Sequence, residues 1–165
     1  MRRLTFLPLL ALLAVGACKS SKPAGQTAQL SKVVTQFQTG WVFGQEYDIE
    51  EAAQGTRPAA NAERGVYRVS GKLTPKSGTI SLQSVGNSVD QFARSKLTEL
   101  GVRVRDVKRS PLGMNGRATT ISYQDDNVAG VMMVSLTTSG DGSSVGYAID
   151  IQEAPRPRAE PSGSG

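Results

Sequence analysis

One cysteine, Cys18, and no histidine in 165 residues set the strongest limit on what this chain can become. A single thiol cannot close a disulfide within the chain, so we expect the fold to be stabilised by packing of apolar side chains. Without histidine, Ser-His-Asp and Cys-His catalysis and imidazole metal sites are excluded. We therefore predict a packed domain that is not an enzyme, with no catalytic residues, no metal site and no cofactor.

The residues before the cysteine have the three parts of a secretory signal. Two arginines follow Met1, an apolar stretch spans 4–14, and small residues occupy 15–17. The apolar stretch is shorter than the roughly 20 residues that a membrane-spanning helix needs. We therefore predict that residues 1–17 are a signal peptide that is removed.

The four residues Val15-Gly16-Ala17-Cys18 resemble the lipobox of bacterial lipoproteins. This resemblance implies that Cys18 becomes the N-terminus of the mature chain and carries diacylglycerol and a further acyl chain such as palmitate. Two or three long acyl chains anchor a protein stably, whereas one is marginal. Lys19 follows the cysteine, which for this class implies the outer membrane, facing the periplasm, in Gram-negative cells. The remaining chain resembles no family.

Composition divides the mature chain into one folded part between two polar ends. Residues 18–27 have the composition of a flexible tether, and residues 154–165 that of a disordered tail. Residues 28–153 then form a single domain, a length that suits one core. Loss of the two signal arginines lowers the formal charge from +5 to about +3, too weakly basic to indicate nucleic acid.

Apolar periodicity predicts two helices. The first spans 28–38, with Thr27 as its N-cap. Its apolar face is formed by four residues at helical spacing: Leu30, Val33, Val34 and Phe37. The second helix spans 89–100 and begins with Ser88 in a capping-box pattern. Its apolar stripe is long enough to cover part of a sheet.

Alternation of apolar and polar residues predicts the strands. They comprise a hairpin over 67–82 that turns at 75–78, followed by strands over 102–105, 119–123, 128–138 and 145–152. The strand over 128–138 is apolar on both faces, which indicates a central position. Short turns favour antiparallel neighbours. We therefore predict an α+β fold, an antiparallel sheet of about five to six strands packed against one or two helices as a two-layer sandwich.

Five basic residues lie close together in sequence, on one predicted strand and just after it: Arg103, Arg105, Lys108, Arg109 and Arg117. Arg103 and Arg105 are expected to project to the same side of the strand. Such a patch can bind an envelope protein, an anionic lipid or an acidic glycan through charge-assisted hydrogen bonds. The alternative is that these side chains only keep an exposed sheet face soluble.

Two other groups of residues suggest different functions. If Met114, Met132 and Met133 lined an apolar cavity, they would indicate a carrier of a lipid or small ligand. The carboxylates within 46–51 would indicate a hydrolase if two of them converged in a cleft. The aspartates near 125 and 141 lack the spacing of a calcium loop, so we expect turns there.

Taken together, these patterns favour a lipid-anchored protein of the bacterial cell envelope that acts as a non-catalytic binding or scaffold module. The N-terminal lipid would bind the membrane, and the basic patch would bind a second envelope component. A lipid or small-ligand carrier and a carboxylate-dependent hydrolase are the two alternatives.

Overall fold

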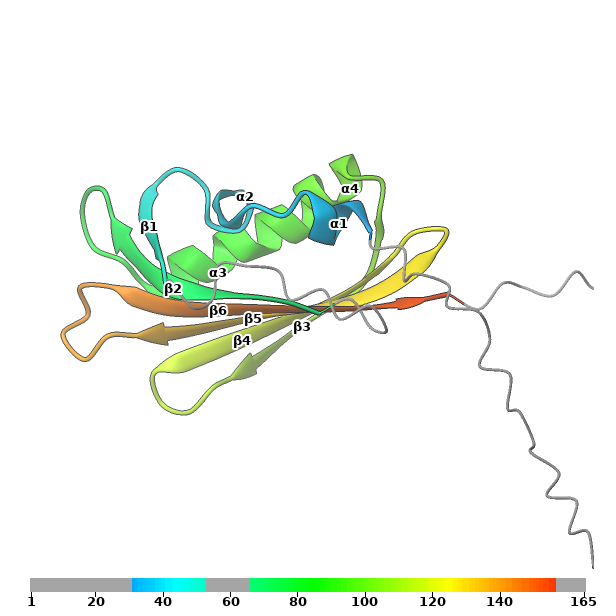
Figure 1. The fold of residues 1–165 in the computed structure, drawn as a ribbon. Coiled ribbons are helices and arrows are strands. Elements are labelled where there is room, and N and C mark those ends of the chain that lie inside the picture. Colours follow the sequence, from blue (N-terminus) through cyan, green and yellow to red (C-terminus); the bar gives the residue numbers. More distant parts are fainter. Residues whose placement is uncertain (1–30, 53–65, 157–165) are drawn as a thin grey trace, which may run out of the picture.

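The computed structural model describes residues 31–52 and 66–156, which form one sheet with helices across one face (Figure 1). Six strands pair antiparallel throughout, in the order β1-β2-β6-β5-β4-β3. They are β1 (Tyr47–Glu51), β2 (Val66–Pro75), β3 (Arg103–Pro111), β4 (Gly116–Gln124), β5 (Val128–Thr138) and β6 (Val145–Pro155). The predicted antiparallel sheet of five to six strands with a few helices is confirmed.

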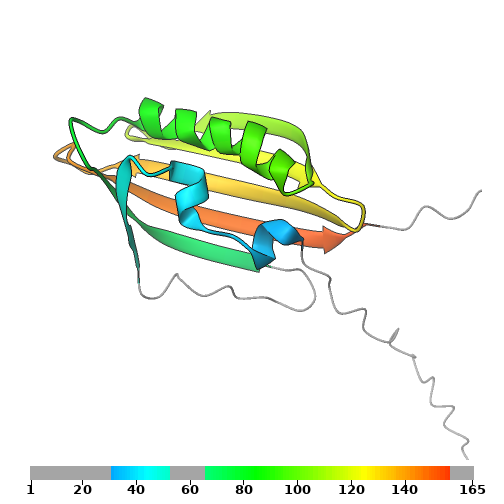
Figure 2. The same ribbon diagram turned by 90° about the horizontal axis from the view of Figure 1, so that it is seen from above.

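The helices lie in two groups above the sheet (Figure 2). Two short helices, α1 (Lys32–Thr35) and α2 (Thr39–Phe43), cross the half that contains β2 and β6. A longer helical segment covers β3, β4 and β5, and it consists of α3 (Leu82–Gln91), the π-helical turn η1 (Phe92–Lys96) and α4 (Leu97–Glu99). Among the described residues, no helix combines the length and the apolar character needed to cross a bilayer.

A pair of serines starts the long helix earlier than predicted. The Ser81 hydroxyl accepts a hydrogen bond from the Ser84 amide (3.0 Å), and the Ser84 hydroxyl accepts one from the Ser81 amide (3.3 Å). This capping box satisfies two amides that the first turn leaves unpaired. The predicted strand through Ile80 and Leu82, and the helix start at 89, are therefore wrong. The hairpin partner of β2 is β1.

The predicted helix over 28–38 is replaced by α1 and α2. Ser31 is the N-cap of α1, where its hydroxyl accepts a hydrogen bond from the Val33 amide (3.0 Å). β-Branched residues lower the helix propensity of this segment, and such short helices depend on packing for their stability. Val33 and Phe43 supply that packing, because both are buried in the core. Thr27 and residues 28–30 lie outside the described residues.

The core fills the space between the helices and the sheet. Alternate residues of the two central strands face it: Met132, Val134, Leu136, Ile149 and Ile151. The helical segment contributes Val85, Val89, Phe92 and Leu97 from above. β5 lies between β4 and β6, so the predicted central position of this strand is confirmed.

A buried carboxylate, that of Glu153, connects Ser31 to Tyr123 by hydrogen bonds. Glu153 is only 4% exposed and accepts hydrogen bonds from the Ser31 amide (2.8 Å), the Ser31 hydroxyl and the Tyr123 hydroxyl (2.5 Å). Burial and then the negative charge of Glu153 raise the pKa of Tyr123, so the phenol keeps its proton and donates it. These hydrogen bonds therefore fix Ser31 against β4 and β6.

Candidate functional site

The sheet register divides the predicted basic patch between the two faces. Arg109 and Arg117 lie on the helix-covered face, because their cross-strand neighbours in β4 and β5 are core residues. Arg103 and Lys108 pair with residues of β4 that alternate to the uncovered face. Arg105 sits at a β-bulge and has no cross-strand partner in the register. The five side chains therefore do not form one surface.

Three of these residues have contacts within the domain. Arg109 forms a two-point ion pair with Asp90 of α3, with Nε 3.2 Å from Oδ1 and Nη2 bonded to Oδ2. Lys108 pairs with Asp106 at 3.3 Å. The Arg117 guanidinium packs against Gly86 of α3, with Nη1 3.1 Å from where a Cβ would lie. Arg109 and Arg117 therefore help to hold α3 on the sheet.

Arg103 lines a hollow of about 590 Å³ at one end of the domain. Arg94 of η1 and Arg156, which follows β6, line the same hollow. Among the described residues, neither Arg94 nor Arg103 forms an ion pair. Three arginines from distant parts of the sequence thus line one hollow.

Apolar and polar residues both line the hollow. Val104 and Val107 are partly exposed and supply apolar surface, Ala93 and Val102 are almost fully buried, and the three arginines are exposed. Two aspartates also line the hollow, but one of them is already engaged. The Asp125 carboxylate accepts hydrogen bonds from the amides of Asn127 (2.8 Å) and Val128 (2.6 Å). The arrangement suits a ligand with an anionic group beside an apolar part.

The β4–β5 turn fixes one of the three arginines. Arg156 Nη1 donates to the Asp125 carbonyl (2.8 Å), and the Arg156 amide donates to the Asn127 carbonyl (2.8 Å). Nothing in the sequence pattern singles out Arg94, on the polar side of a helix. Arg156 belongs to a Pro-Arg-Pro-Arg run in the predicted tail, which could touch an anionic lipid or a partner but is more typical of a solvated tail. Their role depends on the tertiary fold.

The hollow lies at the end of the domain where the described chain begins and ends. Gln124 borders it, and the adjacent Tyr123 shares Glu153 with Ser31. Arg156, the last described residue, is part of its lining. Figure 1 shows α1, α4 and the β4–β5 turn at this same end. Ser31, the first described residue, therefore lies at the same end of the domain as the hollow.

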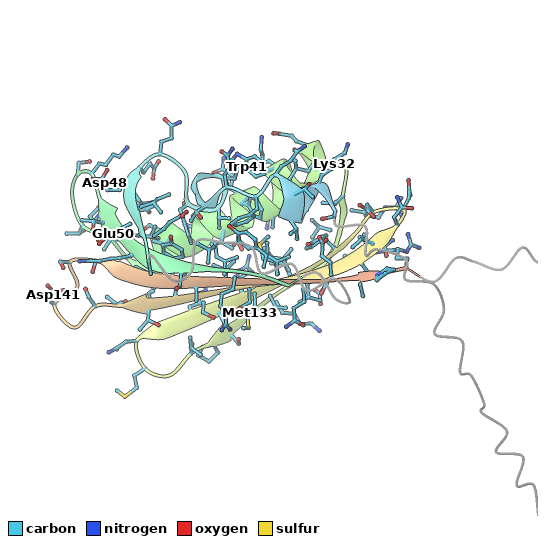
Figure 3. All side chains as sticks on the ribbon, viewed as in Figure 1. Lys32, Trp41, Asp48, Glu50, Met133 and Asp141 are labelled. Carbon is cyan, nitrogen blue, oxygen red and sulfur yellow. The ribbon has the colours of Figure 1, made fainter. Side chains whose placement is uncertain are left out.

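A second hollow of about 500 Å³ lies on the uncovered face, over β1, β2, β6 and β5. Small residues form most of its floor: Ser70, Ser135, Gly146 and Ala148. Glu50 and Lys72, which are cross-strand neighbours, stand at its edge with opposite charges. Further along this face, Val131 and Met133 are 44% and 41% exposed, and Met133 points away from the helices (Figure 3).

The three methionines of the carrier hypothesis do not line a common cavity. Met132 is in the core, Met133 is on the uncovered face, and Met114 is fully exposed in the β3–β4 turn. These three methionines therefore do not provide the shared apolar cavity that would have favoured a carrier.

The carboxylates of the hydrolase hypothesis do not converge either. Asp48 and Glu50 are exposed on the uncovered side of β1, near the end of the sheet opposite Lys32 (Figure 3). Glu51 faces the helices and accepts a hydrogen bond from the Thr39 hydroxyl (2.6 Å). Glu46 is exposed. The described part of this segment holds no buried carboxylate pair.

The aspartate clusters form turns, as their spacing predicts. Asp141 accepts hydrogen bonds from the Ser139 hydroxyl (2.6 Å) and the Ser143 amide (3.0 Å), and these bonds lower its pKa. Across residues 31–52 and 66–156, no three metal-binding side chains gather into a potential metal site. Cys18, the predicted signal peptide, the tether and residues 157–165 lie outside the described residues.

Comparison with known proteins assigns the chain to no family. No family model and no curated protein matches it. LpqN, involved in cell envelope biogenesis of Mycobacterium tuberculosis, is similar at 18% identity over 67% of each chain, with a TM-score of 0.40. The putative thioesterase yhdA from Lactococcus lactis is similar at 8% identity over 68% of this chain and 93% of its own, with a TM-score of 0.25. Similarities this low carry no argument about function.

Proposed function

We propose that this protein is a lipid-anchored, non-catalytic binding module of the bacterial cell envelope, whose arginine-lined hollow binds an anionic group of its partner. The observation that carries the binding site is that Arg94, Arg103 and Arg156 line the same hollow. The anchor rests on the lipobox resemblance at Cys18, and Lys19 after it supports a location at the outer membrane, facing the periplasm, in Gram-negative cells.

The chemistry of the hollow favours binding over catalysis. Guanidinium groups donate paired hydrogen bonds to carboxylate or phosphate and stay charged at every physiological pH. The carboxylates of the lining are Asp125, which is held by backbone amides, and Asp126, which is exposed. Neither carboxylate is buried in the way that is typical of a group that transfers protons in catalysis. The hollow is equipped to hold an anion in place.

Substitution of Cys18 tests the lipid anchor directly. Cys18→Ala is expected to release the protein from the membrane fraction into the soluble fraction, because the acyl chains are lost. Intact-mass measurement should find the acyl mass on the parent protein and not on the variant. A parent protein that lacks the acyl mass would reject the anchor.

The binding site is tested by comparing two neighbouring arginines. Arg103 lines the hollow, whereas Arg105 is equally exposed but outside its lining. With a photoreactive amino acid at Thr98, also in the lining, Arg103→Gln should lower crosslinking in the native envelope about tenfold or more, the value of one charge-assisted hydrogen bond. Arg105→Gln should leave it nearly unchanged. Equal crosslinking in both variants, or none in the parent, would contradict the site.

A further inference from the structure

We infer that the anionic group is the phosphate of an anionic phospholipid in the membrane that holds Cys18, so that the domain binds its own membrane by this end. The inference rests on the proposed function, because it needs both the anchor and the anion-binding hollow. It adds the chemical identity of the partner and the orientation of the domain.

Covalent geometry keeps the hollow near the membrane. At about 3.5 Å per residue, the chain from Cys18 to Ser31 can extend to no more than roughly 45 Å. Ser31 is held by Glu153, which also bonds Tyr123, the neighbour of a residue in the hollow's lining. Lipid headgroups are therefore presented at a high effective concentration, so even a weak site would be occupied.

The hollow has the size and chemistry of a headgroup site. Its volume of about 590 Å³ lies within the roughly 300–1,000 Å³ that small-molecule sites occupy. The arginines can bond phosphate oxygens, while Val104 and Val107, which are partly exposed, offer apolar surface to the glycerol and the first acyl carbons. A free phosphate ion would leave that apolar surface unused.

The charges at the two ends of the domain also favour an orientation in which the hollow faces the membrane. Lys32, exposed in α1, adds a positive charge at the end with the hollow, where the exposed acidic residues are Asp126, Glu99 and Asp106, the last paired with Lys108. Glu99 is neutralised by Lys96 at 2.9 Å. The opposite end carries exposed Asp48, Glu50 and Asp141 (Figure 3), together with Lys72 and Lys76. An anionic surface would attract the first end more strongly.

The test measures binding of the acyl-free chain to vesicles. The mature chain from residue 18, carrying Cys18→Ala, should bind vesicles that contain phosphatidylglycerol and not vesicles of phosphatidylcholine alone. Because each basic residue near an anionic surface strengthens binding about fivefold, R94Q/R103Q should lower the partition coefficient about 25-fold. K72Q/K76Q removes the same charge from the opposite end and should change it less than about twofold, since those residues lie beyond the Debye length.

Three results would overturn the inference: no binding by the parent chain, equal loss in both double variants, or a preference for free phosphate. The preference for free phosphate is tested with inorganic phosphate as the probe, at the same total phosphate concentration as in the vesicle experiment. Binding is measured by the chemical-shift changes of backbone amides in η1 and β3. The acyl mass on Cys18 and the Arg103-dependent crosslinks are measured separately. Arg103-dependent crosslinks to a protein or glycan, without vesicle binding, would keep the proposed function and reject this inference.

Discussion

Replacing Glu153 with alanine is expected to lower the free energy of unfolding by about 4 kcal/mol. The substitution leaves the Ser31 amide, the Ser31 hydroxyl and the Tyr123 hydroxyl without their acceptor in a buried site. Each unpaired buried donor costs about 1–3 kcal/mol, and removal of a buried carboxylate offsets part of that sum. Urea denaturation of parent and variant, followed by circular dichroism, measures the difference.

Two further variants separate the hydrogen bonds from the loss of a charge. Glu50→Ala removes an exposed carboxylate and should change stability by less than about 0.5 kcal/mol. Glu153→Gln keeps the shape and one acceptor, so its effect should lie between the two. If Glu153→Ala were no more destabilising than Glu50→Ala, the network around Ser31 would contribute nothing to stability.

Replacing Gly130 with alanine is expected to cost about 3 kcal/mol of stability. The new Cβ would lie 2.3 Å from the ring carbon that carries the hydroxyl of Tyr123, closer than real Cβ atoms approach other atoms. The ring cannot move aside freely, because its hydroxyl is bonded to Glu153. Overpacking of this kind costs about 1–3 kcal/mol, and displacement of the ring adds the loss of that hydrogen bond. Thermal and urea unfolding both measure the loss.

A control substitution at Gly140 and a Tyr123→Ala background test whether contact with the Tyr123 ring causes this loss of stability. At Gly140, in the β5–β6 turn, an added Cβ meets nothing within 4 Å, so Gly140→Ala should be nearly neutral. When Tyr123 is first replaced by alanine, Gly130→Ala should lose most of its cost, because the ring it strikes is gone. An undiminished cost in that background would show that the strain arises elsewhere.

Local patterns were sufficient for much of the sheet. Alternation identified β4 and β6, and an apolar run on both faces identified β5. Their short turns identified antiparallel neighbours, because a tight turn returns the chain beside itself. The pattern failed at Ile80 and Leu82, where two apolar residues fit a strand as well as a helix. The serines at 81 and 84 decided in favour of the helix by hydrogen bonds that apolar spacing does not reveal.

Only a small part of the candidate site was predictable. Of the five predicted basic residues, Arg103 lines the hollow, while Arg109 is held by Asp90 and Arg117 packs under Gly86. Alternation assigns a residue to a face only while the register is regular, and the bulge at Arg105 interrupts it. Sequence proximity was therefore a poor guide to shared surface.

The sequence by itself determined the absence of histidine and of disulfides, the lipobox resemblance at Cys18 and the alternation that builds the sheet. These are properties of composition and of short segments. Only the tertiary structure decided that Arg94, Arg103 and Arg156 line the same hollow, and that Glu153 is buried beside Ser31. The physical reason is that both depend on which distant segments the strand order and helix packing bring together, and short-range patterns carry no information about such neighbours.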